Sequence, residues 1–468
     1  MELTGRLEYP VPGMNLQSPV KGQTQNTPCS EYQVSNLCGS FQKRRPCAFM
    51  DFRCPRCVLG VYDEFVASDV PDNCLRGVKW SPDGLCLLTA SEDRMLRLFD
   101  LPGELLESEA GEATAAAAAH SPELCSTLKV RAPDSIYDYA WYPFMDSSNP
   151  ATCCFASSSR DSPIHLWDAY TGVSRASYIP YDHLDEVIAA QSIAFSPSGE
   201  RLYAGFERAI RVFDVSRPGR ECTLRPTCST RRARDGLRGL ISCFAFAPDA
   251  PQLFAVGSLA GTIGLYTESS KGLITELRGH TGGVTQCAFS ADGVRLYSAA
   301  RRDGAIQCWD VRLSGRVLAT YHRASPTNQK IGFELLTQPA AAALAPTDNG
   351  ADSAGGATTE AVLSASQDGR VLLYAQGAAP STLLSFAEAT STATLHPYAP
   401  LLAVSVGERR YPLLSLDDEA EEGVEGAAGE GGAQRHANGL TIWQLGVGDQ
   451  RGGGGRTASA VHALAVCD

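Results

Sequence analysis

No stretch of this 468-residue chain approaches the roughly 20 consecutive apolar residues that a helix needs to cross a bilayer. The first residues are also too polar for a secretory signal peptide. We therefore expect an intracellular protein with no membrane partner. Its 16 cysteines are then reduced thiols rather than disulfides, and those inside expected strands, such as Cys86, Cys243 and Cys308, act as small hydrophobic residues.

A second Cys-x-x-Cys pair is also missing. Cys54 and Cys57 form one pair, with Cys47, Cys38 and Cys29 upstream, whereas a structural zinc site needs four ligands and usually two such pairs. A zinc knuckle stays open as an alternative. The favoured interpretation is a flexible leader over residues 1–60 with free thiols, and we expect no metal and no other cofactor.

What the sequence does contain is an internal repeat. A polar turn, a short alternating strand and a closing aromatic residue, often followed by Asp, recur in seven copies. The copies lie at residues 88–100, 157–168, 205–214, 257–266, 298–310, 364–374 and 438–445. Repeats of this length with Trp-Asp and Gly-His signals are typical of four-stranded propeller blades. The sequence therefore predicts an all-β, seven-bladed WD40 propeller.

The spacing between copies locates the domain boundaries and the insertions. We expect the propeller over residues 61–446 and a tail over 447–468, with Ala-, Gly- or acid-rich insertions at 107–120, 339–360 and 415–434. The strand that completes the last blade is expected from residues 61–66 or from residues 458–466. The third insertion carries seven acidic residues, so the net charge of −12 says little about the surface of the blades.

Basic residues recur in the turn between the second and third strands of the expected blades. In this architecture those turns and the connections between blades open on one face. The candidate set is Arg94, Arg160, Arg208, Arg301, Arg302, Arg370, Arg409 and Arg410 from the turns, and Arg231, Arg232, Arg234, Arg238 and Lys330 from the connections. Guanidinium groups in a ring can contact several phosphates and stack on unpaired bases. The alternative is that these residues pair with neighbouring carboxylates.

Four longer strings are more specific than the repeat. They are IYDYAWYPF at residues 136–144, the string at 156–199 that contains PIHLWDAYTG and HLDE, GFERAIRVFDVSRPGRE at 205–221 and TNQKIGFEL at 327–335. They resemble the telomerase Cajal body WD40 family, and the similarity covers about residues 74–445. The resemblance implies a non-enzymatic RNA-binding scaffold of nuclear ribonucleoproteins.

The resemblance also implies partners and a location. Members of this family recognise the CAB-box loop of small Cajal body RNAs and of telomerase RNA, and accompany dyskerin-containing H/ACA particles in the nucleus, in Cajal bodies. A role in telomerase assembly and telomere maintenance follows from the same resemblance. The alternative is a WD40 scaffold that binds proteins and makes no RNA contact.

Two further sets of residues have competing interpretations. His280, Asp303 and Trp309 resemble a catalytic set, yet no nucleophile or second base accompanies them. We interpret them as a structural network in which His280 bridges Asp303 and Trp309, with Ala299 in place of the expected Ser. We expect no enzyme activity and no small-molecule substrate. Tyr181 and His183 are expected on the arginine-bearing face, to stack on a base or to order neighbouring arginines.

Overall fold

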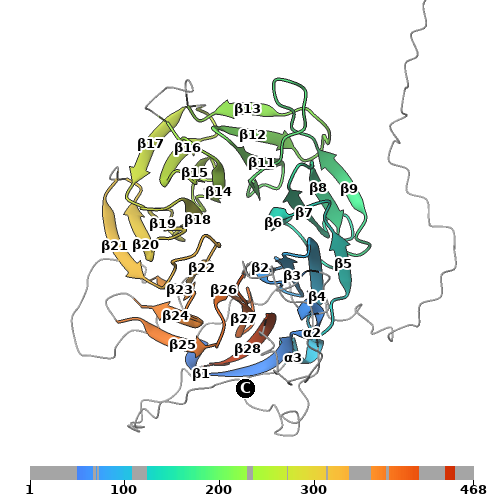
Figure 1. The fold of residues 1–468 in the computed structure, drawn as a ribbon, viewed down its shortest axis with the longest axis vertical. Coiled ribbons are helices and arrows are strands. Elements are labelled where there is room, and N and C mark those ends of the chain that lie inside the picture. The colour runs from blue at the N-terminus through green and yellow to red at the C-terminus, as the bar shows by residue number, and fades with distance from the viewer. Residues whose placement is uncertain are drawn as a thin grey trace, which may run out of the picture.

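The computed structural model describes residues 50–66, 70, 73–107, 124–228, 236–270, 272–312, 315–336, 360–375, 379–409 and 438–447. These residues form seven four-stranded antiparallel sheets arranged around a central axis (Figure 1). The predicted seven-bladed propeller is confirmed.

In each blade the four strands are ordered from the axis outward. Blade 1 contains β2 (Leu75–Trp80), β3 (Cys86–Ser91), β4 (Met95–Asp100) and β5 (Leu128–Arg131), and blade 2 contains β6 (Ile136–Trp141), β7 (Cys154–Ser159), β8 (Ile164–Asp168) and β9 (Ser174–Tyr178). Blade 3 contains β10 (Ser192–Phe195), β11 (Arg201–Phe206), β12 (Ala209–Asp214) and β13 (Thr223–Pro226). Blade 4 contains β14 (Ile241–Phe246), β15 (Leu253–Ser258), β16 (Thr262–Thr267) and β17 (Leu273–Arg278).

The remaining three blades follow the same order. Blade 5 contains β18 (Val284–Phe289), β19 (Arg295–Ala300), β20 (Ala305–Asp310) and β21 (Val317–His322), and blade 6 contains β22 (Phe333–Leu336), β23 (Ala361–Ala365), β24 (Arg370–Tyr374) and β25 (Ser381–Ser385). Blade 7 contains β26 (Thr390–Leu395), β27 (Leu401–Val406), β28 (Gly439–Val447) and β1 (Met50–Val61). Two short helices, α2 (Asp63–Val66) and α3 (Gly103–Glu107), lie beside blade 1.

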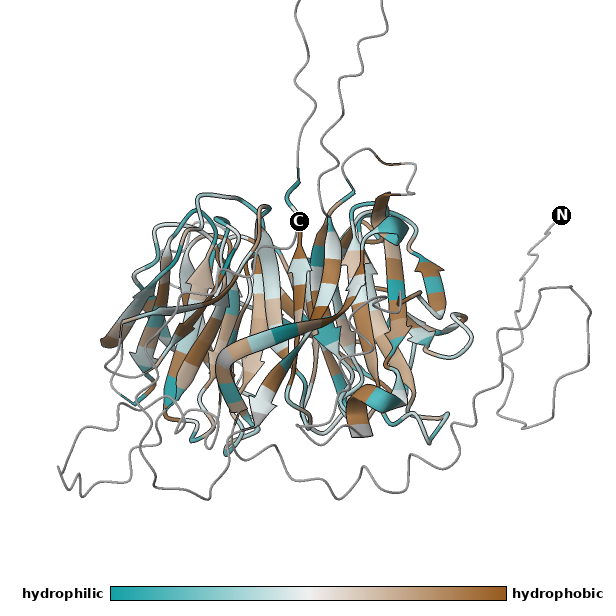
Figure 2. Cartoon of the chain, turned by 90° about the horizontal axis from the view of Figure 1, so that it is seen from below, coloured by the Kyte–Doolittle hydropathy of each residue, from teal (hydrophilic) through white to brown (hydrophobic). Residues whose placement is uncertain are grey.

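The core lies between the blades, because each sheet covers the apolar face of its neighbour. The second strands of blades 1, 2 and 7 are buried at every residue. The closing aromatic residues of the repeat fill the spaces between sheets, and Phe99, Phe213 and Trp309 have no exposed surface. In side view, apolar residues concentrate in the strands of a flat disc whose connections gather on its two faces (Figure 2).

A belt of hydrogen bonds around the axis joins the innermost strands. At every junction a polar side chain of one inner strand reaches the backbone of the next. Six of the seven junctions are joined by the following pairs of side chain and backbone: Arg76 and Ile136, Asp138 and Ile193, Ser192 and Ile241, Ser242 and Val284, Gln286 and Phe333, and Glu334 and Leu395. Ser391 donates to the carbonyl of Leu75 and completes the circle. These bonds satisfy backbone groups at the edges of the inner strands, which would otherwise face the channel unpaired.

The ring closes through β1, which pairs antiparallel with β28 along the outer edge of blade 7. This corrects the sequence-based expectation, because the closing strand is Met50–Val61 rather than residues 61–66 or 458–466. The propeller therefore starts eleven residues earlier than residue 61. Its first half packs Met50 and Phe52 against blade 6, and its second half packs Leu59 and Val61 against blade 1. One strand thus covers both junctions of the last blade.

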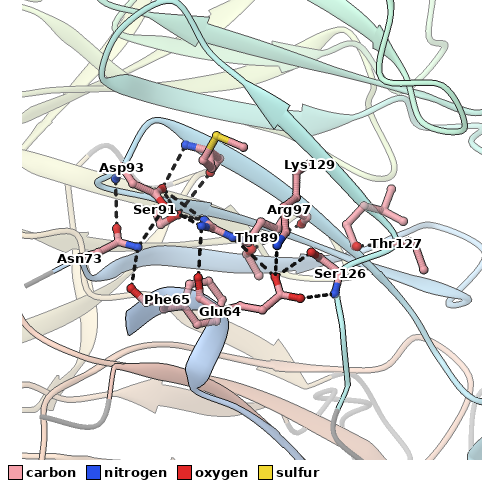
Figure 3. Close-up of polar contacts among 12 residues, drawn as sticks. Glu64, Phe65, Asn73, Thr89, Ser91, Asp93, Arg97, Ser126, Thr127 and Lys129 are labelled. Carbon is pink, nitrogen blue, oxygen red and sulfur yellow. Dashed lines mark hydrogen bonds and ion pairs between the residues drawn. The ribbon is translucent and has the colours of Figure 1, made fainter. Parts of the chain in front are cut away.

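Helix α2 continues from this strand and is held on blade 1 by a buried ion network (Figure 3). Arg97 of β4 pairs with Asp93 at 2.5 Å and lies 3.7 Å from Glu64 of α2. Glu64 also accepts hydrogen bonds from the backbone N–H and the hydroxyl of Ser126, both at 2.6 Å. Asn73 joins Asp93 to the carbonyl of Phe65. The segment that closes the ring is therefore tied to the first blade by charge as well as by packing.

The three predicted insertions lie largely outside the described residues. They fall between α3 and β5, between β22 and β23, and between β27 and β28. Neither described helix has the length and apolar character needed to cross a bilayer.

Candidate nucleic-acid interface

The turns between second and third strands share one face with the connections between blades. Backbone hydrogen bonds join these turns to adjoining connections: to the one that precedes the blade in blades 1, 2, 4, 5 and 6, and to the one that follows it in blade 3. The pairs of N–H donor and carbonyl acceptor are Glu92 and Cys74, Arg160 and Ser135, Arg208 and Gly239, Leu259 and Leu240, Arg301 and Gly283, and Gln367 and Ala324. We call this side of the disc the arginine face. The sequence-based placement of these turns and connections on one side is reproduced by the structure.

Most of the candidate turn residues lie at this face. Five of them are exposed and two are half-buried. The exposed residues are Arg94, Arg160, Arg302, Arg370 and Arg409, and the half-buried ones are Arg208 and Arg301. Some already have acidic neighbours: Arg160 lies 3.6 Å from Asp161, Arg208 lies 3.4 Å from Glu207, and Arg370 pairs with Asp368. Arg238 is exposed in the connection before blade 4. Arg231, Arg232, Arg234 and Arg410 lie outside the described residues.

The backbone of these turns shows why arginine is unusual there. Five non-glycine residues in the described chain have positive φ, and four of them are in these turns: Arg94 (65°), Asp161 (49°), Arg208 (55°) and Arg302 (54°). Blades 4 and 6 use Gly261 and Gly369 instead. A side chain in this region is unfavourable by about 1–2 kcal/mol relative to glycine. Three blades therefore keep arginine where the turn itself favours glycine, a conflict that is typical of functional positions.

The connection over residues 323–332 extends across the centre of this face. Thr327 accepts a hydrogen bond from the N–H of Arg302 in blade 5, and Gln329 Nε2 lies 3.8 Å from the Sγ of Cys74 beside blade 1. Lys330 is exposed in the same connection. Burial lowers the pKa of Lys79 in the inner strand β2, Asp138 opposes this effect, and the charge of Lys330 adds to it. The structure thus brings Lys330 near Lys79, which sequence reasoning missed. The available signal was a second basic residue, after Arg76, in the inner strand β2.

His183 lies in the connection between blades 2 and 3. Residues 181–187 form a small hairpin closed by a bridge between Tyr181 and Val187, and His183 is 81% exposed. Its neighbour Asp185 lies 3.2 Å from Arg220, whose guanidinium stacks on Tyr181, and Arg220 belongs to the connection between β12 and β13. Gly219 of that connection bridges Tyr178 at the end of β9, so the hairpin packs where blades 2 and 3 meet. The expected position of His183 and Tyr181 on the arginine face stays a prediction.

The structural network in blade 5 is complete. His280 Nδ1 lies 2.9 Å from Asp303, His280 Nε2 lies 2.7 Å from Ser298, and the Trp309 indole donates to Ser298 at 2.8 Å. The expectation that Ala299 leaves a gap is wrong, because Leu296 pairs with Trp309. Ser298, two residues along the strand, therefore shares the face of Trp309, and Ala299 points the other way.

The electrostatics of this network hold it in one protonation state. Burial lowers the pKa of His280, although Asp303 opposes this effect. Burial would raise the pKa of Asp303, but hydrogen bonds from His280, Thr281 and Ala305 lower it overall. A neutral imidazole that donates to Asp303 and accepts from Ser298 satisfies all of these groups. These hydrogen bonds fix the turn that contains Asp303.

The cysteines considered for zinc lie in or before the closing strand. Cys54 is exposed and Cys57 is half-buried in β1. Across the described ranges, no three His, Cys, Asp or Glu side chains are grouped as metal ligands. Cys29, Cys38 and Cys47 fall outside those ranges.

Comparison with known proteins agrees with the architecture. Residues 67–100 and 271–310 match the WD domain, G-beta repeat family. The first segment contains the first three strands of blade 1, and the second contains the last strand of blade 4 and the first three strands of blade 5. The two matched segments are WD40 repeats. The chain is 42% identical over 375 residues to human telomerase Cajal body protein 1 and 41% identical over 380 residues to the bovine protein. The Drosophila melanogaster homologue is 36% identical over 266 residues. The predicted resemblance to the telomerase Cajal body WD40 family is confirmed.

The extent of these alignments differs between the two partners. They cover 80% and 79% of this WD40 chain, but 62% of the human and 64% of the bovine protein. The Drosophila alignment covers 56% of this chain and 46% of that protein. The chain therefore spans less than two thirds of the length of these relatives.

Proposed function

We propose that this protein is a non-catalytic RNA-binding scaffold of nuclear ribonucleoproteins that recognises CAB-box-type loops with its arginine face. The observation that carries the proposal is the set of arginines in the turns, three of them at positive φ. Loop arginines that are held by the backbone can contact phosphates and stack on unpaired bases without ordering a new segment. The similarity to telomerase Cajal body protein 1 supports the same choice.

The proposed partners follow from this function. They are small Cajal body RNA and telomerase RNA, within H/ACA particles that contain dyskerin, and the proposed location is the Cajal body of the nucleus. In this role the propeller directs the RNA to that body and supports telomerase assembly and telomere maintenance. The second candidate is a protein-binding scaffold, which the carboxylates beside Arg160 and Arg208 favour because paired arginines are less available to phosphate.

A charge-reversal experiment tests the proposal. We reverse four residues of the arginine face to Glu: Arg160, Arg208, Arg301 and Arg302. The matched control reverses four arginines near the opposite face: Arg201, Arg217, Arg312 and Arg316. Affinity for a CAB-box hairpin and for the same hairpin with a scrambled loop is measured at several salt concentrations. Each lost phosphate contact reduces the salt slope by about 0.7.

We expect the first variant to bind RNA more weakly and with less salt dependence than the control variant, while both melt close to the unchanged protein. Exposed loop substitutions usually change stability by no more than about 0.5 kcal/mol. If the two variants bind equally, the arginine face is not the interface. If the unchanged protein does not distinguish the two hairpins, the protein-binding candidate replaces this one.

A further inference from the structure

A cavity of about 330 Å³ lies at the outer part of the arginine face, beside blade 4. Its lining comes from three segments that the fold brings together: the connection before blade 4, the turn after β15, and the ends of β16 and β17 nearest that turn. The lining residues are Gly236, Arg238, Ala260, Thr262, Glu276 and Arg278. This volume lies within the range of roughly 300–1,000 Å³ that is usual for small-ligand sites.

The polar groups of this cavity are incompletely satisfied. Glu276 Oε2 lies 2.9 Å from a nitrogen of Arg278, but Glu276 Oε1 is buried and has no hydrogen-bond partner. Thr262 Oγ1, on the neighbouring strand, is also buried and without a partner. Buried polar atoms of native proteins are rarely left without a hydrogen-bond partner, so these two oxygens need an explanation. Arg278 is 64% exposed, so its guanidinium can move aside and uncover the carboxylate.

We propose that this cavity binds the base of a single-stranded guanine nucleotide. A carboxylate accepts hydrogen bonds and cannot donate them, so Glu276 selects a ligand that presents two adjacent N–H donors. Among the RNA bases, guanine alone presents such a pair, at N1 and N2. Thr262 supplies a hydroxyl donor to a base acceptor, and the guanidinium of Arg278 stacks on the ring or contacts the neighbouring phosphate.

The other bases fit this chemistry less well. Adenine and cytosine each place a ring acceptor beside their amino group, which faces the carboxylate unfavourably, and uracil has one donor between two carbonyls. The inference deepens the proposed function and rests on it, because it assigns a base preference to the same RNA-binding face. A basic protein side chain is the other occupant that a lone carboxylate accepts, and the experiment distinguishes the two.

The test uses the full chain and short oligouridines that carry one central guanosine, inosine or adenosine. Inosine lacks the N2 amino group and keeps every other feature of guanosine. We expect the guanosine oligonucleotide to bind about tenfold more tightly than the inosine one, because inosine loses one hydrogen bond to the charged carboxylate. In Glu276→Gln, which exchanges one acceptor oxygen for a donor, the ratio should fall to about one. Glu221→Gln removes the same charge from an exposed position in the connection between β12 and β13 and should keep the ratio.

The guanosine and inosine comparison in the unchanged protein needs no variant, so the inference stays testable even where a variant folds poorly. Equal affinity for the three oligonucleotides overturns the guanine assignment and leaves the cavity to a basic protein side chain, while specific hairpin binding keeps the proposed function. If neither the oligonucleotides nor the CAB-box hairpin binds, the proposed function fails and this inference fails with it.

Discussion

Blades 1 and 5 fix the same turn with different chemistry. In blade 5, Asp303 of the turn is held by a neutral chain of hydrogen bonds through His280, Ser298 and Trp309. In blade 1, Phe99 occupies the position of the Trp, and Asp93 of the turn is held by the buried charge of Arg97. Both arrangements connect a turn carboxylate to the connection that precedes the blade.

The two networks differ in the elements of the fold that they connect. The blade 5 network stays inside its own blade and the connection that enters it. The blade 1 network extends through Glu64 and Phe65 into α2, which directly follows the closing strand β1. A neutral network stabilises one blade, whereas the charged network also links the two ends of the ring. A substitution that breaks the network of blade 1 should therefore reduce the free energy of unfolding more than one that breaks the network of blade 5.

The largest expected effect comes from removing the closing strand. A chain that begins at Pro71 lacks the buried side chains of Met50, Phe52, Leu59, Val61 and Phe65. At roughly 1.5–3 kcal/mol for each buried side chain, this loss is about 10 kcal/mol, comparable to the whole stability of a domain. We expect this chain to lose its cooperative melting transition. Circular dichroism and calorimetry check the result.

A chain that begins at Met50 is the matched control for that truncation, because it keeps β1 and α2 complete. It should melt as cooperatively as the full chain. Cooperative melting of the chain that begins at Pro71, at an unchanged temperature, would mean that the ring does not depend on β1.

The next effect comes from the charge that links blade 1 to α2. Arg97→Met leaves Asp93 and Glu64 buried without their guanidinium partner, which should reduce the free energy of unfolding by about 3–5 kcal/mol. Lys129→Met is the control, because Lys129 contacts the same Glu64 at 3.3 Å but is 49% exposed. An exposed pair of this kind contributes at most about 1 kcal/mol. Urea unfolding measures both values, and equal losses would contradict the proposed link.

Sequence patterns predicted the parts of this molecule that repeat. The closing aromatic residues, Trp309 and Phe99 among them, marked the third strands, since each fills the same space between sheets. The closing strand has no such pattern: Pro55 interrupts it, and register shifts separate Asp51 from Arg56 and Cys57 from Leu59. Its pairing is decided by the unpaired edge of β28, which lies almost 400 residues away along the chain.

In the candidate site, too, only the residues that belong to the repeat could be predicted from the sequence. The turn arginines could be placed from the repeat, because each turn has a fixed position within its blade. His183 could not, since the connection that holds it leaves the blade and packs on Arg220. Ser298 was missed by one residue, because the side of a strand on which a residue lies depends on its register with the next strand. Glu276 has no motif, and its significance comes from an unpaired oxygen.

The smallest expected effect is a difference in pH dependence between the two networks. Burial lowers the pKa of His280 below its usual 6.5, so the unfolded chain binds this proton more readily than the folded chain. Stability from His280 is therefore fully present above about pH 6.5 and falls as the pH decreases through the range below it. In blade 1, the pKa values of Asp93 and Glu64 are lowered by their hydrogen bonds, against the effect of burial, from 3.8 and 4.5. Those carboxylates keep their contribution until the pH falls below these values.

Unfolding free energies measured between pH 7 and pH 5 test this difference. We expect His280→Gln to reduce the loss of stability on acidification, by at most about 1.4 kcal/mol per pH unit, the value for one proton. It should not abolish the loss, because burial also lowers the pKa of His396 to about 4, and this group acts in the same direction. Asp93→Asn, in the charged network, should lower the stability by a similar amount at both pH values, since Asp93 is ionised throughout this range. An unchanged slope in His280→Gln would show that the imidazole of blade 5 does not stay neutral in the folded chain, and a changed slope in Asp93→Asn would remove the distinction between the two blades.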